Sequence, residues 1–426
     1  MTFRIALVVW LSSLGTALAA GSAAPTFSRD VAPLLNRHCV RCHRPGEIAP
    51  MSLTSYAKVR PYAKAIRDEL ISGSMPPWLA DRHVGHFEND PRLTDDELST
   101  IVKWVAAGAK EGNRRDLPSP PKFVEGWAMG KPDVEFALPK PVEVPAKGAL
   151  PNLYFTVDTN LAEDHFVSGI EIRPGNREVV HHITVFIEQK ERRQFRKQPA
   201  IACTDTYFEE AALREQREHS DALALSKRQY LYSWTPGSNP FSAPDGSGRL
   251  IPAGSRLVFE VHYAPNGTPT TDRSRIGLRF VTRPVRKEVL TLVETNEAIR
   301  IPPRDPNYEA EACMLITREV VLTALKPHMH LRGHDMRFDV EFPDGRKQAL
   351  LLVPNWNFDW QLTYQLAQPL TLPPGARIRI VAHYDNSPRN RRNPDPNKSV
   401  IWDDQSTGEM LAGMITLEEP FRSSAH

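Results

Sequence analysis

The chain contains one Cys-x-x-Cys-His pentad, Cys39-Val40-Arg41-Cys42-His43. Two thiols at this spacing, followed directly by an imidazole, form the attachment site of a c-type haem. Cys39 and Cys42 would hold the porphyrin through thioether bonds, and His43 would be one axial ligand of the iron. The pentad therefore predicts one covalently bound haem c and a redox role for this part of the chain.

A second axial ligand of the iron is expected further along the chain. Met75, in Gly73-Ser74-Met75-Pro76-Pro77-Trp78, is the preferred candidate, because a thioether ligand raises the haem potential and suits electron transfer. His83 and His86, which lie in a polar stretch, are the alternatives.

The N-terminus has the pattern of a secretory signal peptide. Arg4 precedes a short apolar run over residues 5–14, and Ala17-Leu18-Ala19 is a small-x-small cleavage site. We predict a cleaved signal over residues 1–19, with an uncleaved anchor as the alternative. Export to the periplasm or beyond agrees with the pentad, since c-type haem is attached outside the bacterial cytoplasm. No later run of eighteen apolar residues occurs, so no membrane span is expected in the mature chain.

Composition adds weaker constraints. The 426 residues include 53 basic and 51 acidic side chains, and this balance gives no argument for a nucleic-acid partner. The 38 prolines favour turns and strand ends, and so a β-rich body. Outside the pentad only Cys203 and Cys313 remain. In an oxidising compartment they form either one disulfide or two buried thiols.

The chain divides into regions of different pattern. Residues 26–113 have helix signals, among them a capping box at Thr94-Asp95-Asp96-Glu97. Their order around the pentad is that of a class I-like cytochrome c domain. Residues 114–149 are rich in Pro and Lys and are expected to form a linker. From residue 150, short apolar alternation broken by Pro and Gly is typical of β-sandwiches, except for a helical stretch near 208–229.

An internal repeat lies within the β-rich part. Pro252 to Tyr263 and Pro373 to Tyr384 both fit P-x-G-x-R-x5-H-Y without a gap. A histidine cluster precedes each copy, and this pairing predicts two related units over 150–288 and 289–420. The predicted fold class is thus multidomain: a small all-α cytochrome c domain followed by two all-β sandwich (jelly-roll-like) domains.

The histidine clusters have the spacing of metal ligands. His328 and His330 lie at i and i+2, which places both imidazoles on one face of a strand. His181 and His182 are adjacent, so joint ligation needs a twist or a strand end at that point. His262 and its repeat counterpart His383 fall on the mixed rather than the apolar faces of their strands. Met410 completes the set, because two imidazoles and a thioether favour copper, particularly Cu(I).

Taken in order, these motifs resemble the copper type II, ascorbate-dependent monooxygenases, the family of the peptidylglycine α-hydroxylating and dopamine β-monooxygenases. The resemblance covers about residues 150–420. It implies two β-sandwiches that face each other across a solvent-filled cleft, with one copper ion each. The implied ligands are His181, His182 and His262 for one copper, and His328, His330 and Met410 for the other.

The sequence also departs from the family. Its peptide-amidating members hold a substrate carboxylate with an Arg, an Asn and a Tyr, and here those places are taken by Lys326, Ala412 and Met414. A smaller or more apolar substrate is therefore expected. His383 has no counterpart among the implied ligands, and it is an extra ligand, a group that supports a ligand, or a polar surface residue.

The predicted function is an exported, copper-dependent monooxygenase that hydroxylates a C–H bond of a small organic substrate with O2. Electrons would enter through the haem, which an external donor would reduce. His328, His330 and Met410 would form the catalytic site, and two copper ions and one haem c would be the cofactors. One alternative is a periplasmic haem and copper protein that transfers electrons or handles copper without oxygenase activity. Another is a haem-tethered binding module that holds no copper.

Overall fold

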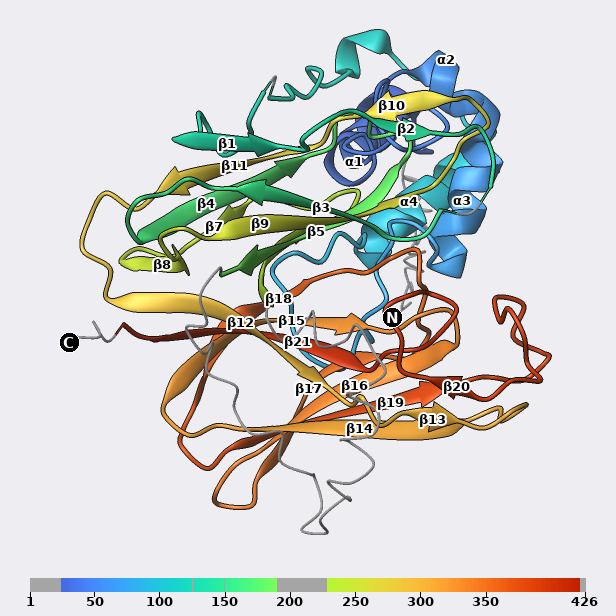
Figure 1. Ribbon diagram of the computed structural model, residues 1–426. Coiled ribbons are helices and arrows are strands. Elements are labelled where there is room, and N and C mark those ends of the chain that lie inside the picture. The colour runs from blue at the N-terminus through green and yellow to red at the C-terminus, as the bar shows by residue number, and fades with distance from the viewer. Residues whose placement is uncertain (1–23, 125, 149, 190–227, 422–426) are drawn as a thin grey trace, which may run out of the picture.

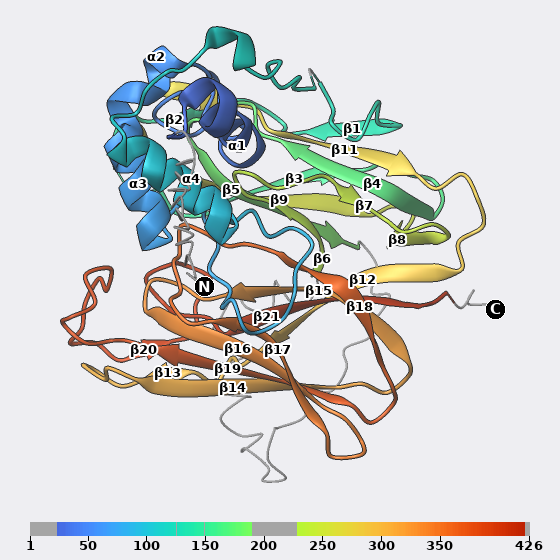
Figure 2. The ribbon, with the colours of Figure 1, turned by 180° about the vertical axis from the view of Figure 1, so that it is seen from behind.

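The computed structural model describes residues 24–124, 126–148, 150–189 and 228–421. β-Strands dominate the fold and form two β-sandwiches, one stacked on the other, with short helices packed at one end (Figures 1 and 2). The largest sheet has nine strands in the order β1-β11-β4-β8-β12-β21-β15-β18, with β7 beside β4. Its strands are β1 (Val134–Ala137), β4 (His165–Arg173), β7 (Phe241–Ser242), β8 (Ser247–Ile251), β11 (Arg275–Phe280), β12 (Lys287–Thr295), β15 (Val320–His328), β18 (Tyr364–Leu372) and β21 (Ala412–Pro420).

Two four-stranded sheets complete the sandwiches. The first has the order β3-β9-β5-β6 and consists of β3 (Leu153–Asp158), β5 (Val180–Glu188), β6 (Arg228–Trp234) and β9 (Arg256–Tyr263). The second has the order β14-β19-β16-β17 and consists of β14 (Tyr308–Leu315), β16 (Gly333–Glu341), β17 (Lys347–Val353) and β19 (Arg377–Tyr384). Two small ladders join β2 (Val142–Val144) to β10 (Thr270–Asp272) and β13 (Arg300–Ile301) to β20 (Val400–Ile401).

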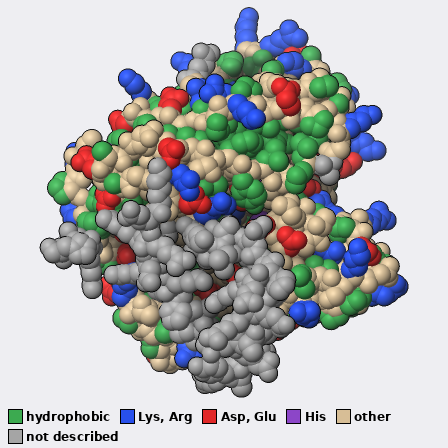
Figure 3. Space-filling view, viewed as in Figure 1, with side chains coloured by type: hydrophobic (Ala, Val, Ile, Leu, Met, Phe, Trp, Pro, Cys, Tyr) green, Lys and Arg blue, Asp and Glu red, His purple; other side chains and the backbone are tan. Residues whose placement is uncertain are grey.

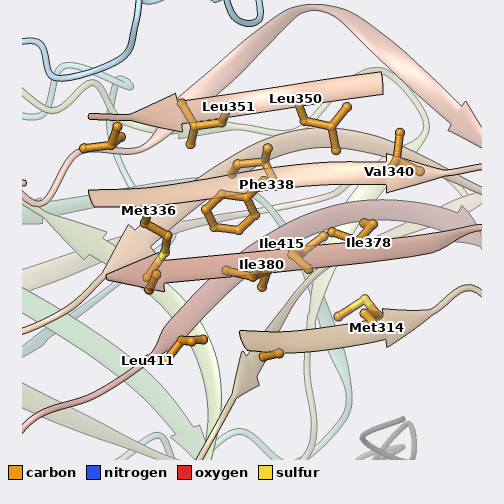
Figure 4. Close-up of a cluster of buried hydrophobic side chains, with 14 of the residues drawn as sticks. Met314, Met336, Phe338, Val340, Leu350, Leu351, Ile378, Ile380, Leu411 and Ile415 are labelled. Atoms are coloured by element: carbon orange, nitrogen blue, oxygen red, sulfur yellow. The ribbon is translucent and has the colours of Figure 1, made fainter. Parts of the chain in front are cut away.

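Strand alternation explains where each core sits. On β9, Leu257, Phe259, Val261 and Tyr263 all enter the core of the first sandwich, as the period of two along this strand predicts. The second sandwich is filled in the same way from β16, β19 and β21, and Figure 4 shows Phe338, Ile380 and Ile415 meeting between the layers. The faces of β9 and β5 that point away from this core are mixed: they carry the histidines as well as the buried apolar side chains of Val258 and Phe186.

The predicted fold class is wrong, because the structure is mostly β-sheet and shows no separate all-α cytochrome c domain. The N-terminal helical elements are short: η1 (Phe27–Val31), α1 (Ala32–His38), α2 (Tyr56–Val59), η2 (Arg60–Tyr62), α3 (Ala63–Ser72), α4 (Asp95–Ala106) and η3 (Arg114–Asp116). Between α3 and α4 the chain leaves the helices and crosses to the second sandwich (Figure 1). Trp78 and Ala80 belong to the core of that sandwich, and Phe87 forms a β-bridge with Leu366 of β18.

This difference has a physical cause in the distribution of apolar side chains. The capping box at Thr94 is confirmed, with reciprocal hydrogen bonds between Thr94 and Glu97. Local signals of this kind fix where a helix begins. They do not show that Trp78 packs against Tyr364 of the sheet, at a ring-centroid distance of 4.7 Å, instead of against the helices.

The two sandwiches are joined by more than a linker. β8 pairs in parallel with β12 through Lys287↔Ser247 and Glu288↔Gly248, so the nine-stranded sheet runs from one sandwich into the other. β12 itself spans the expected division at 288/289. The residues expected to form a linker contain β1 and β2, which pair with β11 and β10.

The internal repeat is visible in the strand order. β9 lies between β3 and β5 as β19 lies between β14 and β16. His181 and His182 lie on β5, and the counterpart of β5 in the second sandwich is thus β16. His328 ends β15, a strand of the large sheet, so the two histidine clusters do not occupy equivalent strands as the repeat had suggested.

Several predictions fall on residues that the structure does not describe. The signal peptide over 1–19, Cys203 and most of the 208–229 stretch lie outside the described residues. Cys313 is buried on β14, and its pairing with Cys203 stays a prediction. Among the helices of the described ranges, none has the length and apolarity needed to cross a membrane. On the described part of the face in Figure 3, basic and acidic side chains are interspersed with apolar ones.

Candidate metal centres

Three histidines meet on the polar side of the first sandwich. His181 and His182 lie on β5, and His262 lies on the neighbouring strand β9. Each residue offers one ligand atom, and these three atoms lie within 4.8 Å of one another. The ring centroids are 5.1–5.3 Å apart and the rings are steeply inclined to each other. This arrangement allows three imidazoles to converge on one ion.

A β-bulge resolves the problem of adjacent histidines. The register between β5 and β9 shifts between Val180 and His182, so that His182 lies opposite His262. An extra residue at a bulge re-aims the side chains beside it. His181 is therefore brought to the same side as His182, which is the local twist that joint ligation requires.

The ring nitrogens of this group fit a metal ion. His181 Nδ1, His182 Nε2 and His262 Nδ1 are buried and have no hydrogen-bond partner. Buried polar atoms are nearly always paired in native proteins. Three orphaned nitrogens in one cluster therefore fit the donor set of a metal ion.

Burial keeps these imidazoles neutral, which is the form that binds a metal. Burial lowers the pKa of His181, and it lowers that of His182 well below the usual value. The pKa of His262 falls to about 4, first through burial and then through the charge of His181.

A second pair of imidazoles lies at the end of β15. The rings of His328 and His330 have centroids 5.2 Å apart and are nearly perpendicular. His328 Nδ1 is 2.8 Å from Gln361 Oε1, and His330 Nδ1 is 3.4 Å from the Gly408 carbonyl oxygen. Because both partners are acceptors, each histidine must carry its proton on Nδ1. Both Nε2 atoms are thus left with a lone pair, as in most protein metal sites.

The environment of this pair is also strongly apolar. Burial lowers the pKa of His328 to about 4 and that of His330 to about 3. Neither imidazole would be protonated at neutral pH.

Glu409 ties Met410 to the same pair. The Glu409 side chain is fully buried and accepts backbone N–H groups from His330 at 2.8 Å, Arg332 at 2.6 Å and Met410 at 3.2 Å. Burial raises the pKa of this carboxyl to about 7. One side chain thereby fixes the turn after β15 against the segment that leads into β21. Met410 itself packs against Trp402.

One aromatic ring lies near members of both groups. The ring of Phe358, in the loop between β17 and β18, has its centroid 6.0 Å from that of His262 and 6.4 Å from that of His181. The same centroid is 6.1 Å from that of the His330 ring. The His262 and His330 rings are therefore no more than about 12 Å apart. The expected solvent-filled cleft contains a buried phenylalanine at this point.

The pentad forms a turn directly after α1. His43 Nδ1 lies 3.2 Å from the Met51 carbonyl oxygen, which again fixes the proton on Nδ1 and leaves Nε2 with a lone pair. Neither Cys39 nor Cys42 forms a disulfide, and burial raises the pKa of Cys39 to about 12.

The candidates for the second iron ligand lie beyond α3. Met75 lies in the turn after α3, beyond Gly73 and Ser74. Its neighbours Ser74 and Pro77 line a cavity of ≈ 480 Å³, whose opposite wall is formed by Trp356 and Trp360 of the β17–β18 loop. The alternatives His83 and His86 are exposed on the segment that packs against β17 and β18.

His383 and Lys326 have other partners. His383 Nδ1 is 2.9 Å from Asp335 and its Nε2 is 3.2 Å from Glu309, so both ring nitrogens face carboxylates. In the second sandwich Asp335 lies opposite His383, at the place where His182 lies opposite His262 in the first sandwich. Lys326 is buried, and its ammonium group donates to Ser233 Oγ of the first sandwich.

Three residues near the sites were missed from the sequence: Phe358, Gln361 and Glu409. Two of them lie in the loop between β17 and β18. Their sequence, Asn355-Trp356-Asn357-Phe358-Asp359-Trp360-Gln361, has no ligand spacing. Glu409 precedes Met410 and could have been singled out only as a charged residue within an apolar segment.

Comparison with known proteins gives one relationship in sequence. A search with protein-family models found no match. Over 184 residues the chain is 28% identical to DBH-like monooxygenase protein 1 of Gallus gallus, a match that covers 38% of this chain and 29% of that protein. The chain thus spans less than a third of its relative. The similarity supports, at most, the resemblance to the copper monooxygenases, and it gives no support for a fused cytochrome c domain.

Solved structures add no argument. The major capsid protein P2 of bacteriophage PM2 aligns with 69% of this chain and all of its own at 10% identity, with a TM-score of 0.26. A chain of Broad Bean Stain Virus aligns with 70% of this chain and 92% of its own at 10% identity, with a TM-score of 0.28. Scores this low carry no conclusion about fold or function.

Proposed function

We propose that this protein is an exported copper-dependent monooxygenase that hydroxylates a C–H bond of a small substrate with O2. The observation that carries the proposal is the pair of unlike donor groups that both lie near Phe358. One group offers three imidazoles with orphaned nitrogens. The other offers two imidazoles whose free Nε2 atoms are set by hydrogen bonds, with Met410 tied to them by Glu409. The relationship to a DBH-like monooxygenase points in the same direction.

Each donor group suits a copper ion in a different way. His181, His182 and His262 would hold one ion, and His328, His330 and Met410 would hold the other. A thioether donor favours Cu(I), so the second site is proposed as the place where O2 and substrate meet. When bound, the copper ions would supply the one-electron chemistry by which O2 is activated and a C–H bond is hydroxylated.

The protein residues keep the histidines neutral and oriented. Burial holds the five histidines in the unprotonated form. Gln361 and the Gly408 carbonyl orient the two imidazoles of the second site. Lys326 is committed to Ser233 and buried between the sandwiches, which disfavours it as a receptor for a substrate carboxylate. A small, neutral or apolar substrate is therefore proposed.

Electrons would enter through a haem c attached at Cys39 and Cys42 with His43 as a ligand. The Nδ1–H of His43 is held by Met51 and its Nε2 is free for iron, which fits a proximal haem ligand. Arg41 donates to the Ser238 carbonyl at 2.9 Å, so the pentad lies against the first sandwich. The proposed haem would carry electrons one at a time from an external donor, and Met75 is proposed as its second ligand.

A product screen tests the proposal. Copper-loaded, pre-reduced protein is given isotopically labelled O2 and a panel of small substrates with activated C–H bonds. We expect label in one hydroxylated product and substrate-stimulated oxygen uptake. If copper binds, but neither label nor stimulated uptake is found, a copper-handling or electron-transfer protein without oxygenase activity becomes the better account. If the protein contains iron but binds no copper, the account of a haem-tethered binding module is favoured.

A further inference from the structure

A cavity of ≈ 480 Å³ lies between the turn after α3 and the loop that joins β17 to β18. Its first wall is formed by residues 72–74 and 77–79. Its second wall is formed by Asn355, Trp356, Asn357, Trp360 and Arg392. Sites for small molecules have volumes of about 300–1,000 Å³ and are lined by aromatic side chains with a few polar groups. The cavity therefore has the size and composition of a small-molecule site.

Three indole rings line this cavity from both walls. Trp78 comes from the first wall, and Trp356 and Trp360 come from the second. The Trp78 ring is held edge-on against Tyr364, with centroids 4.7 Å apart. The Trp356 ring is fixed by its Nε1, which donates to the His330 carbonyl oxygen at 3.1 Å. Fixed aromatic surfaces on two walls favour a flat aromatic ligand, because aromatic rings attract each other in stacked and edge-to-face arrangements.

One polar atom of the lining lacks a partner. Trp78 is 7% exposed, and its Nε1 is buried with no hydrogen-bond partner among the described residues. A buried N–H group is nearly always paired in native proteins. Because Trp78 lines the cavity, an oxygen acceptor on a molecule held there would supply the missing hydrogen bond.

The charge of the lining argues against an ionic ligand. Arg392 is the one charged residue among the described lining residues. Three indoles can also surround a cation, but the guanidinium on the second wall disfavours one. Arg392 forms a 2.6 Å ion pair with Asp359, which weakens its attraction for an anion. A neutral ligand therefore fits the cavity best.

We propose that this cavity binds a small, neutral, flat aromatic molecule that carries an oxygen acceptor. The indole rings hold the ring of the ligand, and Trp78 Nε1 donates to its oxygen. The inference goes beyond the proposed function, because none of the described lining residues is a proposed copper or haem ligand. Trp356 connects the cavity to the second histidine pair, since the same indole lines the cavity and donates to the His330 carbonyl oxygen.

The test measures the affinity of the purified full-length protein for three compounds of similar size by ligand-observed NMR. Acetophenone is neutral and carries a carbonyl oxygen, ethylbenzene lacks the acceptor, and phenyltrimethylammonium carries a positive charge. Trp78→Phe keeps an aromatic ring but removes the N–H group, and Trp360→Leu removes one indole from the loop. Trp402→Phe is the matched control, because Trp402 Nε1 is also buried without a partner but Trp402 lies outside the lining. Thermal unfolding confirms that each variant is folded.

The wild type is expected to bind acetophenone about 10-fold more tightly than ethylbenzene, and more tightly than phenyltrimethylammonium. Trp78→Phe should lose the preference for acetophenone over ethylbenzene. Trp360→Leu should weaken the binding of both neutral compounds about 3–10-fold, and Trp402→Phe should match the wild type. No binding of acetophenone, binding of the cation as tight as that of acetophenone, or wild-type affinities in both cavity variants would overturn the inference and leave the proposed function standing.

Discussion

The two proposed copper sites are built by different means. In the first site the ligands are placed mainly by strand register: His182 lies opposite His262, and a bulge turns His181 to join them. The free nitrogens of these rings have no protein partner. In the second site the imidazoles are held by side chains and carbonyls from outside the strand, namely Gln361, Gly408 and Glu409.

This difference suggests a division of roles. A site that is fixed by backbone register keeps its geometry with little support and suits an ion that only stores and passes an electron. A site whose ligands are oriented by hydrogen bonds can be tuned by those partners, and it suits the ion that meets O2 and substrate. The comparison predicts that substitutions of residues around the ligands lower the copper affinity of the second site and hardly change that of the first.

The largest effect is expected from loss of a ligand in the first site. His182→Ala removes the most deeply buried imidazole of the three. Bound copper should fall from two ions to one per chain, and hydroxylation should be abolished, because the copper that would pass the second electron to the methionine site is lost. Metal analysis checks this, and two ions retained in His182→Ala would exclude the three-histidine site.

Glu409→Gln is expected to have the next largest effect. The substitution keeps the volume but weakens the acceptor of three backbone N–H groups. Copper affinity of the second site should fall about 10–100-fold, and the free energy of unfolding should fall by about 1–3 kcal/mol. Glu418→Gln is the control, since Glu418, on β21, is buried like Glu409 but pairs with Lys287. Equal copper affinity in the two variants would contradict the role of Glu409.

A smaller effect is expected from Gln361→Leu. Without the Gln361 acceptor, His328 is free to take either neutral tautomer, and only one of them leaves Nε2 for the metal. Copper affinity of the second site should fall toward the lower end of that range, about 10-fold, with the first site unchanged. Gln361→Glu should restore affinity because it keeps an acceptor at the same place. Titration with a competing copper chelator measures both variants.

The last prediction concerns the stability of the metal-free protein as the pH is lowered. Burial lowers the pKa of His262 and His328 to about 4 and that of His330 to about 3, while an unfolded histidine titrates near 6.5. Between about pH 6.5 and 4 the unfolded chain binds protons that the folded chain does not, so stability falls as the pH is lowered. The loss is on the order of 3 kcal/mol per histidine.

His383, at the surface of the second sandwich, changes the stability with pH in the opposite direction. Against the effect of burial, Asp335 and Glu309 raise its pKa, so its contribution is present at low pH and is lost as the pH rises. Denaturant unfolding with chelator at pH 7 and pH 4.5 measures the balance. Glu260 and Glu409, whose pKa burial raises to about 7, act in the same direction as His383. The test is therefore made by comparison with His330→Gln, and an unchanged pH dependence in this variant would show that the His330 imidazole is not a buried neutral group.

The sequence predicted the parts of the sites that depend on local pattern. The alternation along Arg256–Tyr263 placed His262 on the polar face of its strand, and the structure has it there. The spacing of His328 and His330 placed two imidazoles side by side. The need for a twist at His181-His182 was also visible, and the bulge supplies it.

The parts that were wrong or missed depend on contacts between distant segments. Helix signals over residues 26–113 gave no sign that Trp78 would enter the core of a sandwich more than two hundred residues away. Phe358 and Gln361 lie in a loop without ligand spacing, and only the fold brings them to the histidines. The repeat suggested equivalent clusters, but Asp335 stands opposite His383 and takes it away from any metal.

X-ray absorption at the copper edge of the Cu(I)-loaded protein tests the central claim, that the two sites are chemically unlike, most directly. We predict scattering from nitrogen at both sites and from one sulfur atom at one of them, because a thioether donor binds Cu(I) well. Met410→Leu should remove the sulfur signal and leave the nitrogen signal of the three-histidine site. Wild-type spectra with nitrogen and oxygen neighbours only, or a sulfur signal that persists in Met410→Leu, would contradict the account.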